Sequence, residues 1–170
     1  MKLVLINFFI LTVFVFSINA QTIVSCDVKA YVVNPVSGRS LAVRKGPSGS
    51  SAVLANLSKK KLDTVFVTGS SGSWIRINHA EDEEENVFFR GHGWVPVGPF
   101  GLSTASSPDT GFHYLYSGQG KNTKHLLKLK PDEGVDLLSC SGKWVKVRVK
   151  GKIGWLAPEA QCSNSRTTCV

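Results

Sequence analysis

Four cysteines and four histidines are the residues of this 170-residue sequence best able to supply a nucleophile, a general base or metal ligands. A Cys–His hydrolase needs a free thiolate beside an imidazole, whereas we expect the cysteines of this chain to be oxidised to disulfides. Zinc ribbons and thioredoxin-type redox sites use a C-x-x-C spacing, which is absent here. No G-x-S-x-G, H-E-x-x-H or phosphate-binding glycine loop occurs. We therefore expect no enzymatic activity, no metal and no cofactor.

The histidines give no sign of catalytic use. His92 lies between two glycines, which is typical of a turn. The others stand without a companion motif: His79, His113 and His125.

Five consecutive acidic residues occur in the sequence A-E-D-E-E-E-N at residues 80–86. Such a run could form a metal site or a pair of catalytic acids. Metal-binding loops, however, alternate their ligands with turn residues, and adjacent side chains of an extended loop point apart. We interpret the run as the solvated tip of a hairpin.

Aromatic side chains supply another kind of chemistry, the binding of a peptide or a sugar. The tryptophans form two pairs, Trp74 with Trp94 and Trp144 with Trp155. Large aromatic residues fill small barrels, and on the rim of such barrels they also form the floor of binding grooves. Tyr114 and Tyr116, which precede the turn at Gly118, have the same two possible roles.

Alternating apolar residues predict strands around these side chains. In L-A-V-R-K-G-P at residues 41–47, Leu41 and Val43 point to one face and Arg44 to the other. The Gly-Pro pair ends that strand. W-I-R-I at residues 74–77 alternates in the same way, and G-W-V follows at residues 93–95.

The later part of this pattern occurs twice. Residues 142–147 match residues 72–77, and residues 154–156 match residues 93–95. Residues 115–118 fall where residues 43–46 would lie, and Leu126 and Leu129 correspond to Leu54 and Leu57. The second copy lacks the V-R-x-G-P sequence of the first.

The order L-x-V-R-x-G-P, turn, W-x-x-I, turn, G-W-V resembles the bacterial SH3-like domain family. The resemblance implies an all-β protein made of two tandem small SH3-like barrels joined by a Gly/Pro/Ser-rich linker. The expected boundaries are residues 21–101 for the first barrel with its acidic hairpin insertion, 102–111 for the linker, and 112–170 for the second barrel with its cysteine-containing tail.

Family members often serve cell-wall hydrolases as targeting modules, so the resemblance also implies binding of cell-wall peptides or other extended segments. We expect this chain to be the targeting part alone, without a catalytic domain. The candidate ligand-binding residues are Arg44, Trp74, Trp94, Tyr114, Tyr116, Trp144 and Trp155.

Residues 1–20 are expected to be a secretory signal peptide. Lys2 precedes an apolar run at residues 3–16, and small residues follow up to a cleavage site after Ala20. The run is shorter than the roughly 20 residues that span a bilayer, so we expect cleavage rather than a membrane span. The protein is thus predicted to be secreted or periplasmic, with the type of cell envelope left open.

Export would make the cysteines disulfide partners. The four cysteines are Cys26, Cys140, Cys162 and Cys169. They can form two disulfides in three possible pairings, which the sequence alone does not distinguish. Our working hypothesis joins Cys140 to Cys162 or Cys169, which would clamp the tail. Residues 23–26, I-V-S-C, loosely fit a lipidation box, but Cys26 lies ten residues beyond Phe16, the end of the apolar run. Lipidation of Cys26 is the alternative.

Positive charge is concentrated in the second copy. Residues 102–170 hold ten basic and five acidic residues, against nine and seven in residues 21–101. Lys146, Arg148 and Lys150 alternate with three valines, which either a solvated strand or a face for an anionic partner would explain. Nucleic acid is not expected as a partner, because the sequence predicts export and contains no helix-turn-helix or zinc-finger motif.

The sequence therefore predicts an exported, non-catalytic protein that binds peptidoglycan or a cell-wall peptide. The alternative is a protein–protein adaptor or inhibitor that docks on another exported protein. The ligand and the oligomeric state stay open.

Overall fold

The computed structural model describes residues 22–34, 40–58, 62–106, 111–163 and 169. The predicted signal peptide, residues 107–110 of the predicted linker, and residues 164–168 and 170 of the tail lie outside this part of the chain. Within it, no helix is long and apolar enough to cross a lipid bilayer.

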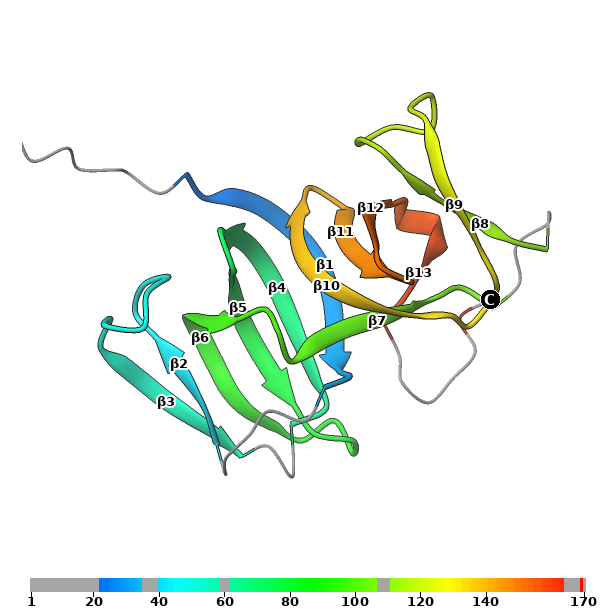
Figure 1. Cartoon of the computed structure of the whole chain (residues 1–170). Helices are drawn as coiled ribbons and strands as arrows, with labels where there is room; N and C mark the ends of the chain where they lie inside the picture. Colours follow the sequence, from blue (N-terminus) through cyan, green and yellow to red (C-terminus); the bar gives the residue numbers. More distant parts are fainter. Residues whose placement is uncertain (1–21, 35–39, 59–61, 107–110, 164–168, 170) are drawn as a thin grey trace, which may run out of the picture.

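The fold is all-β, as predicted, apart from one turn of 3-10 helix, η1 (Pro158–Ala160) (Figure 1). Residue alternation explains the strands: in W-V-K-V-R-V of β11, the three valines are buried and Arg148 is exposed. The strands are β1 (Val24–Val32), β2 (Ser40–Arg44), β3 (Val53–Ser58), β4 (Thr64–Ser71), β5 (Trp74–Glu81), β6 (Val87–Pro96), β7 (Phe100–Thr104), β8 (His113–Tyr116), β9 (His125–Leu129), β10 (Gly134–Ser141), β11 (Trp144–Val149), β12 (Lys152–Leu156) and β13 (Gln161–Cys162).

All the named strands pair antiparallel, in the order β3-β2-β6-β5-β4-β1-β7-β10-β11-β12-β8-β9, with β13 added beside β7. We call β1 to β6 the first half and β7 to β13 the second half. The pairing order of the first half, β1-β4-β5-β6-β2-β3, is repeated in the second as β7-β10-β11-β12-β8-β9. The two halves therefore share one topology.

The strand registers show that the structural repeat includes β8 and β9, although their sequences match those of β2 and β3 only weakly. Arg44 pairs with Trp94 in the first half, and Tyr116 pairs with Trp155 in the second. Leu57 of β3 and Leu129 of β9 hold matching positions opposite β2 and β8. Gly72 and Gly142, in the matching turns, both have φ of +56°, which glycine adopts without a steric penalty.

The two halves are joined by strand pairing, so the prediction of two barrels separated by a linker is not confirmed. β1 pairs with β4 along most of its length and with β7 through Tyr31 and Val32. β7 then pairs with β10. Residues 102–104, predicted as linker, form part of β7 because Leu102 is an apolar residue that becomes fully buried there.

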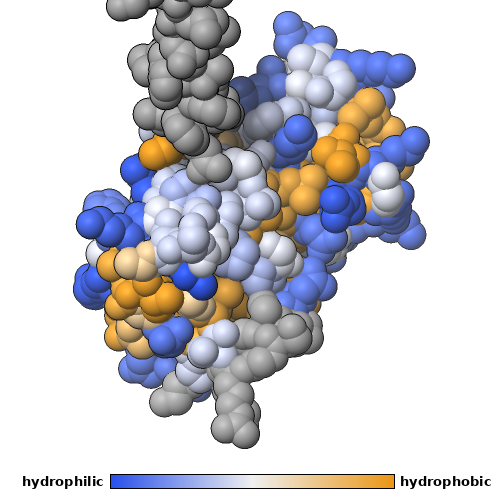
Figure 2. Space-filling model, turned by 60° about the vertical axis from the view of Figure 1, so that its left-hand side comes forward, coloured by the Kyte–Doolittle hydropathy of each residue, from blue (hydrophilic) through white to orange (hydrophobic). Residues whose placement is uncertain are grey.

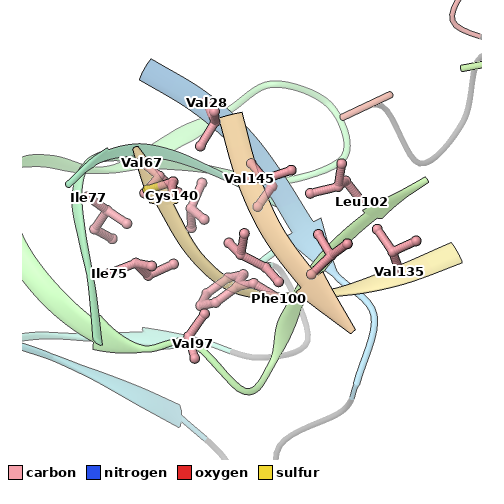
Figure 3. Close-up of a cluster of buried hydrophobic side chains, with 14 of the residues drawn as sticks. Val28, Val67, Ile75, Ile77, Val97, Phe100, Leu102, Val135, Cys140 and Val145 are labelled. Carbon is pink, nitrogen blue, oxygen red and sulfur yellow. The ribbon is translucent and has the colours of Figure 1, made fainter. Parts of the chain in front are cut away.

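A single hydrophobic core runs through both halves (Figure 3). Phe100 of β7 is among the largest fully buried side chains. It lies between Val97 on the first-half side and Val145 and Val135 of the second half (Figure 3). Burial of a phenylalanine contributes roughly 1.5–3 kcal/mol, so this residue stabilises the junction directly.

The disulfide hypothesis for Cys140 is wrong. Cys140 is bonded to Cys26 of β1, and Cys162 is bonded to Cys169. Residues next to Cys26 explain the pairing, because the Gly142 N–H donates to the Ser25 carbonyl oxygen (2.8 Å) and the Asp27 N–H donates to the Gly142 carbonyl oxygen (3.0 Å). These bonds bring β1 beside the β10–β11 turn. The bond to Cys140 leaves no thiol on Cys26 for a lipid.

A buried hydroxyl adds to this junction. Ser70 Oγ of β4 donates to the Cys140 carbonyl oxygen (2.9 Å) and accepts from the Cys140 N–H (3.3 Å). Both backbone groups of Cys140 therefore have a hydrogen-bond partner. A buried backbone group without a partner would lower the stability of the fold.

The two disulfides are expected to differ in their effect on stability. Cys26 and Cys140 are 114 residues apart, whereas Cys162 and Cys169 are 7 apart. In the chain-entropy model, loss of the first bond costs about 5 kcal/mol and loss of the second about 2 kcal/mol. Urea unfolding of C26A/C140A and C162A/C169A, each compared with the oxidised protein, measures this. An equal loss in both variants would contradict it.

The β7 junction also predicts a difference between two neighbouring glycines. A Cβ on Gly101 would collide with the Val135 carbonyl oxygen and lie 2.8 Å from Val33 Cγ2, whereas a Cβ on Gly98 meets nothing within 4 Å. We expect Gly101→Ala to lower the free energy of unfolding by about 1–3 kcal/mol. Gly98→Ala is the matched control and should leave it nearly unchanged. A Gly101→Ala variant as stable as the control would show that β7 does not pack this closely.

Candidate functional site

Five aromatic rings form a continuous series on the second half, which we call the aromatic band: Phe112, Tyr114, His125, Tyr116 and Trp144. Tyr114 stacks on His125 with ring centroids 3.9 Å apart. Edge contacts connect Phe112 to Tyr114 (5.1 Å), His125 to Tyr116 (5.2 Å) and Tyr116 to Trp144 (5.8 Å). Lys128 Nζ lies 3.3 Å from the Phe112 ring centroid, a favourable cation–π geometry.

Strand alternation builds the band. In F-H-Y-L-Y at residues 112–116, Phe112, Tyr114 and Tyr116 share one face, while Leu115 points into the core. His125 of β9 lies opposite Tyr116, which brings its ring between the two tyrosines. His125 is exposed, and Tyr114 and Trp144 are half-buried. The band therefore presents aromatic surface to solvent.

A row of side chains extends from the band across the neighbouring strands. Tyr116 of β8, Trp155 of β12 and Lys146 of β11 lie directly opposite one another. Because directly opposite residues share a face of the sheet, these three side chains are neighbours. We call them the second-half row. Trp155 and Lys146 are half-buried, and Tyr116 is buried.

The first half has a matching row in which two arginines form hydrogen bonds within the chain. Arg44, Trp94 and Arg76 occupy the positions of Tyr116, Trp155 and Lys146. Arg44 Nη1 donates to the Ser51 carbonyl oxygen (2.8 Å), and Arg76 donates to Thr68 Oγ1 (3.1 Å) and to the Thr68 carbonyl oxygen (3.2 Å). Both arginines thus have internal partners.

The candidate residues are accordingly divided between the two halves. Tyr114, Tyr116 and Trp144 lie within the aromatic band, and Trp155 adjoins it. In the first half, Trp94 is only 5% exposed and Trp74, at the position of Trp144, is half-buried.

Two members of the band, Phe112 and His125, were missed at the sequence level. The period-two pattern of residues 112, 114 and 116 could have identified Phe112. No local signal identifies His125, because its neighbours come from a different strand.

A groove lies at the junction of the two halves, with a volume of about 440 Å³. It is lined by the β4–β5 turn at Ser71 and Gly72 from the first half, and by Ser141, Lys146 and Trp155 from the second. A groove of this size falls within the range for small-ligand sites. The sequence could not indicate it, because it forms only where the two halves meet.

Two glutamates of the second half pair with lysines. Glu133 pairs with Lys150 (2.5 Å), and Glu159 pairs with Lys121 (2.5 Å). Partial burial acts to raise the pKa of both carboxyls, but the hydrogen bonds from the two lysines leave each pKa below its ordinary value. The hydrogen bond between Lys121 and Glu159 raises the pKa of Lys121. Lys146 has no ion pair with any described residue.

The acidic run has a local structural role. Asp82 Oδ1 accepts hydrogen bonds from the Glu84 N–H (3.1 Å) and the Asn86 N–H (2.8 Å), which shapes the β5–β6 turn. Glu81 pairs with His79 (2.9 Å). In the described part of the chain, no three His, Cys, Asp or Glu side chains converge in a metal-binding arrangement.

No protein-family model and no curated protein matches the chain. Among solved structures, it is similar to NlpC2 and NlpC1 from Trichomonas vaginalis, at 9% and 10% identity, with TM-scores of 0.35 and 0.32. These alignments cover 85% of this chain and 49% and 47% of the NlpC proteins. A proposed autolysin from Listeria monocytogenes aligns at 17% identity over 83% of this chain and 64% of its own, with a TM-score of 0.27. Matches at this level establish neither a shared fold nor a shared activity.

The different burial of matched tryptophans predicts different structural contributions. Trp94→Ala removes a buried side chain and should lower the free energy of unfolding by about 3–5 kcal/mol. Trp155→Ala removes a half-buried ring and should cost clearly less. Urea unfolding of both variants measures the difference. Equal costs would mean that Trp155 is as much a core residue as Trp94.

Proposed function

We propose that this protein is an exported, non-catalytic binding protein that recognises cell-wall peptides or similar extended segments of peptidoglycan. The aromatic band is the observation that carries the proposal. Its rings present partly exposed aromatic surface on paired strands, and aromatic side chains are enriched among the residues that contribute most to binding.

The position of the band suits an extended ligand. β9 is the last strand in the pairing order and carries His125 and Lys128. An extended peptide can lie beside such an edge and place alternate side chains on the rings. The surrounding lysines favour an anionic polymer.

The architecture in this proposal is a pair of SH3-like units. The equal pairing order of the two halves and the matched Arg44–Trp94 and Tyr116–Trp155 positions support this assignment. The units share β1–β7 pairing and one core, so they would present their surfaces in a fixed relation. A non-catalytic role is favoured because all four cysteines lie in disulfides, which leaves no thiolate for a Cys–His mechanism.

A docking role on another exported protein is the second candidate. Val53 and Leu54 on the terminal strand β3 are 48% and 51% exposed. Figure 2 shows that apolar surface on the face drawn is divided into separate patches by hydrophilic side chains. Exposed apolar residues on a terminal strand are a common feature of protein contact surfaces.

Co-sedimentation with purified peptidoglycan tests the proposal. The oxidised protein should sediment with the wall at low and moderate salt. The double variant Tyr114→Ala/His125→Ala should bind about tenfold more weakly, because loss of two contact rings removes at least 1.4 kcal/mol of binding free energy.

Phe66→Ala is the matched control, since Phe66 forms an aromatic pair with His79 in the first half and should not affect binding. Protein that stays in the supernatant under all these conditions would refute wall binding. A single stoichiometric protein partner recovered from the native envelope would then favour the docking role.

A further inference from the structure

The second-half row contains a cation, Lys146, without the side-chain hydrogen-bond acceptor that the first half provides for Arg76. Arg76 and Lys146 occupy the same position, and each lies beside a β-bulge of the preceding strand. The bulged residue of the first half is Thr68, which accepts the Arg76 hydrogen bonds. The corresponding bulged residue of the second half is Leu138, whose side chain cannot accept a hydrogen bond.

The environment of Lys146 differs from that of Arg76 in a second respect. Lys146 and its row neighbour Trp155 line the junction groove, whereas Trp94, beside Arg76, is buried. The groove lining contains several hydroxyl groups, including those of Ser71 and Ser141, and no acidic residue. Lys146 is therefore the one charged side chain among the described residues that line the groove.

We propose that the junction groove binds the free carboxylate end of a short peptide, with Lys146 as its counter-ion and Trp155 as its apolar wall. This inference rests on the proposed function and adds to it the place and chemistry of one subsite. A carboxylate supplies the hydrogen-bond acceptor that Thr68 supplies to Arg76. The neighbouring serine hydroxyls can donate to its second oxygen.

The groove and the aromatic band are close enough for one ligand to reach both. Neighbouring strands lie about 4.8 Å apart, so Lys146 and Tyr116, separated by β12, are roughly 10 Å apart. Three extended residues span about 10 Å. A tripeptide with its carboxylate at Lys146 therefore reaches the band with its first residue.

Nuclear magnetic resonance titration of the oxidised, ¹⁵N-labelled protein with diacetyl-L-Lys-D-Ala-D-Ala tests this subsite. We expect a saturable shift of the Trp155 indole N–H and of amides at Ser71 and Ser141. The C-terminal amide of the same peptide lacks the negative charge and should bind about fivefold to tenfold more weakly. Lys146→Gln should weaken binding of the free acid to the level of the amide.

Two variants control for general charge effects. Arg76→Gln changes the matched cation of the first half, and Lys152→Gln removes an exposed lysine of β12. Both should leave the affinity for the free acid unchanged. If either weakens binding as much as Lys146→Gln does, the assignment of Lys146 is wrong.

The remaining outcomes separate this inference from the proposed function. Equal binding of acid and amide, or shifts confined to Tyr114 and His125, would overturn the groove assignment while wall co-sedimentation persists. Shifts caused by N-acetylmuramic acid and not by the peptide would overturn the peptide assignment. Loss of wall binding in the unsubstituted protein would refute the proposed function itself.

Discussion

The structure depends on the insertion of β7 between β1 and β10. Phe100 enters the centre of a core formed by both halves, and β7 hydrogen-bonds to a strand of each. A domain of about sixty residues buries a smaller fraction of its surface than a larger one and is correspondingly marginal. A common core removes that difficulty for both halves. The disulfide from Cys26 to Cys140 adds a covalent bond at the same junction.

This junction also explains how two halves of equal topology can differ in their surfaces. In the first half, Arg44 and Arg76 form hydrogen bonds within the chain and Trp94 is buried beneath its neighbours. In the second half, the same positions hold Tyr116 and a lysine without an ion pair in the described chain. The cations of the first half are thus satisfied within the chain, whereas the second half leaves His125 exposed and Trp155 and Lys146 partly exposed.

The sequence predicted local features of the fold well. Alternation predicts the strands around Val43, Trp74 and Val145, and repeat spacing alone aligns Tyr116 with Arg44, as the strand registers confirm. It did not predict that β7 joins the halves, that Cys26 pairs with Cys140, or that His125 enters the aromatic band. Each of these depends on which distant strand lies alongside, and residue periodicity reports the face of a strand but not its neighbour.

Differential scanning calorimetry of the oxidised protein tests most directly whether the two halves form one cooperative structure. A common core through Phe100 predicts a single transition, with a calorimetric enthalpy equal to the van't Hoff enthalpy. Two separable transitions, each with its own van't Hoff enthalpy, would show that the halves unfold independently and would contradict the central claim.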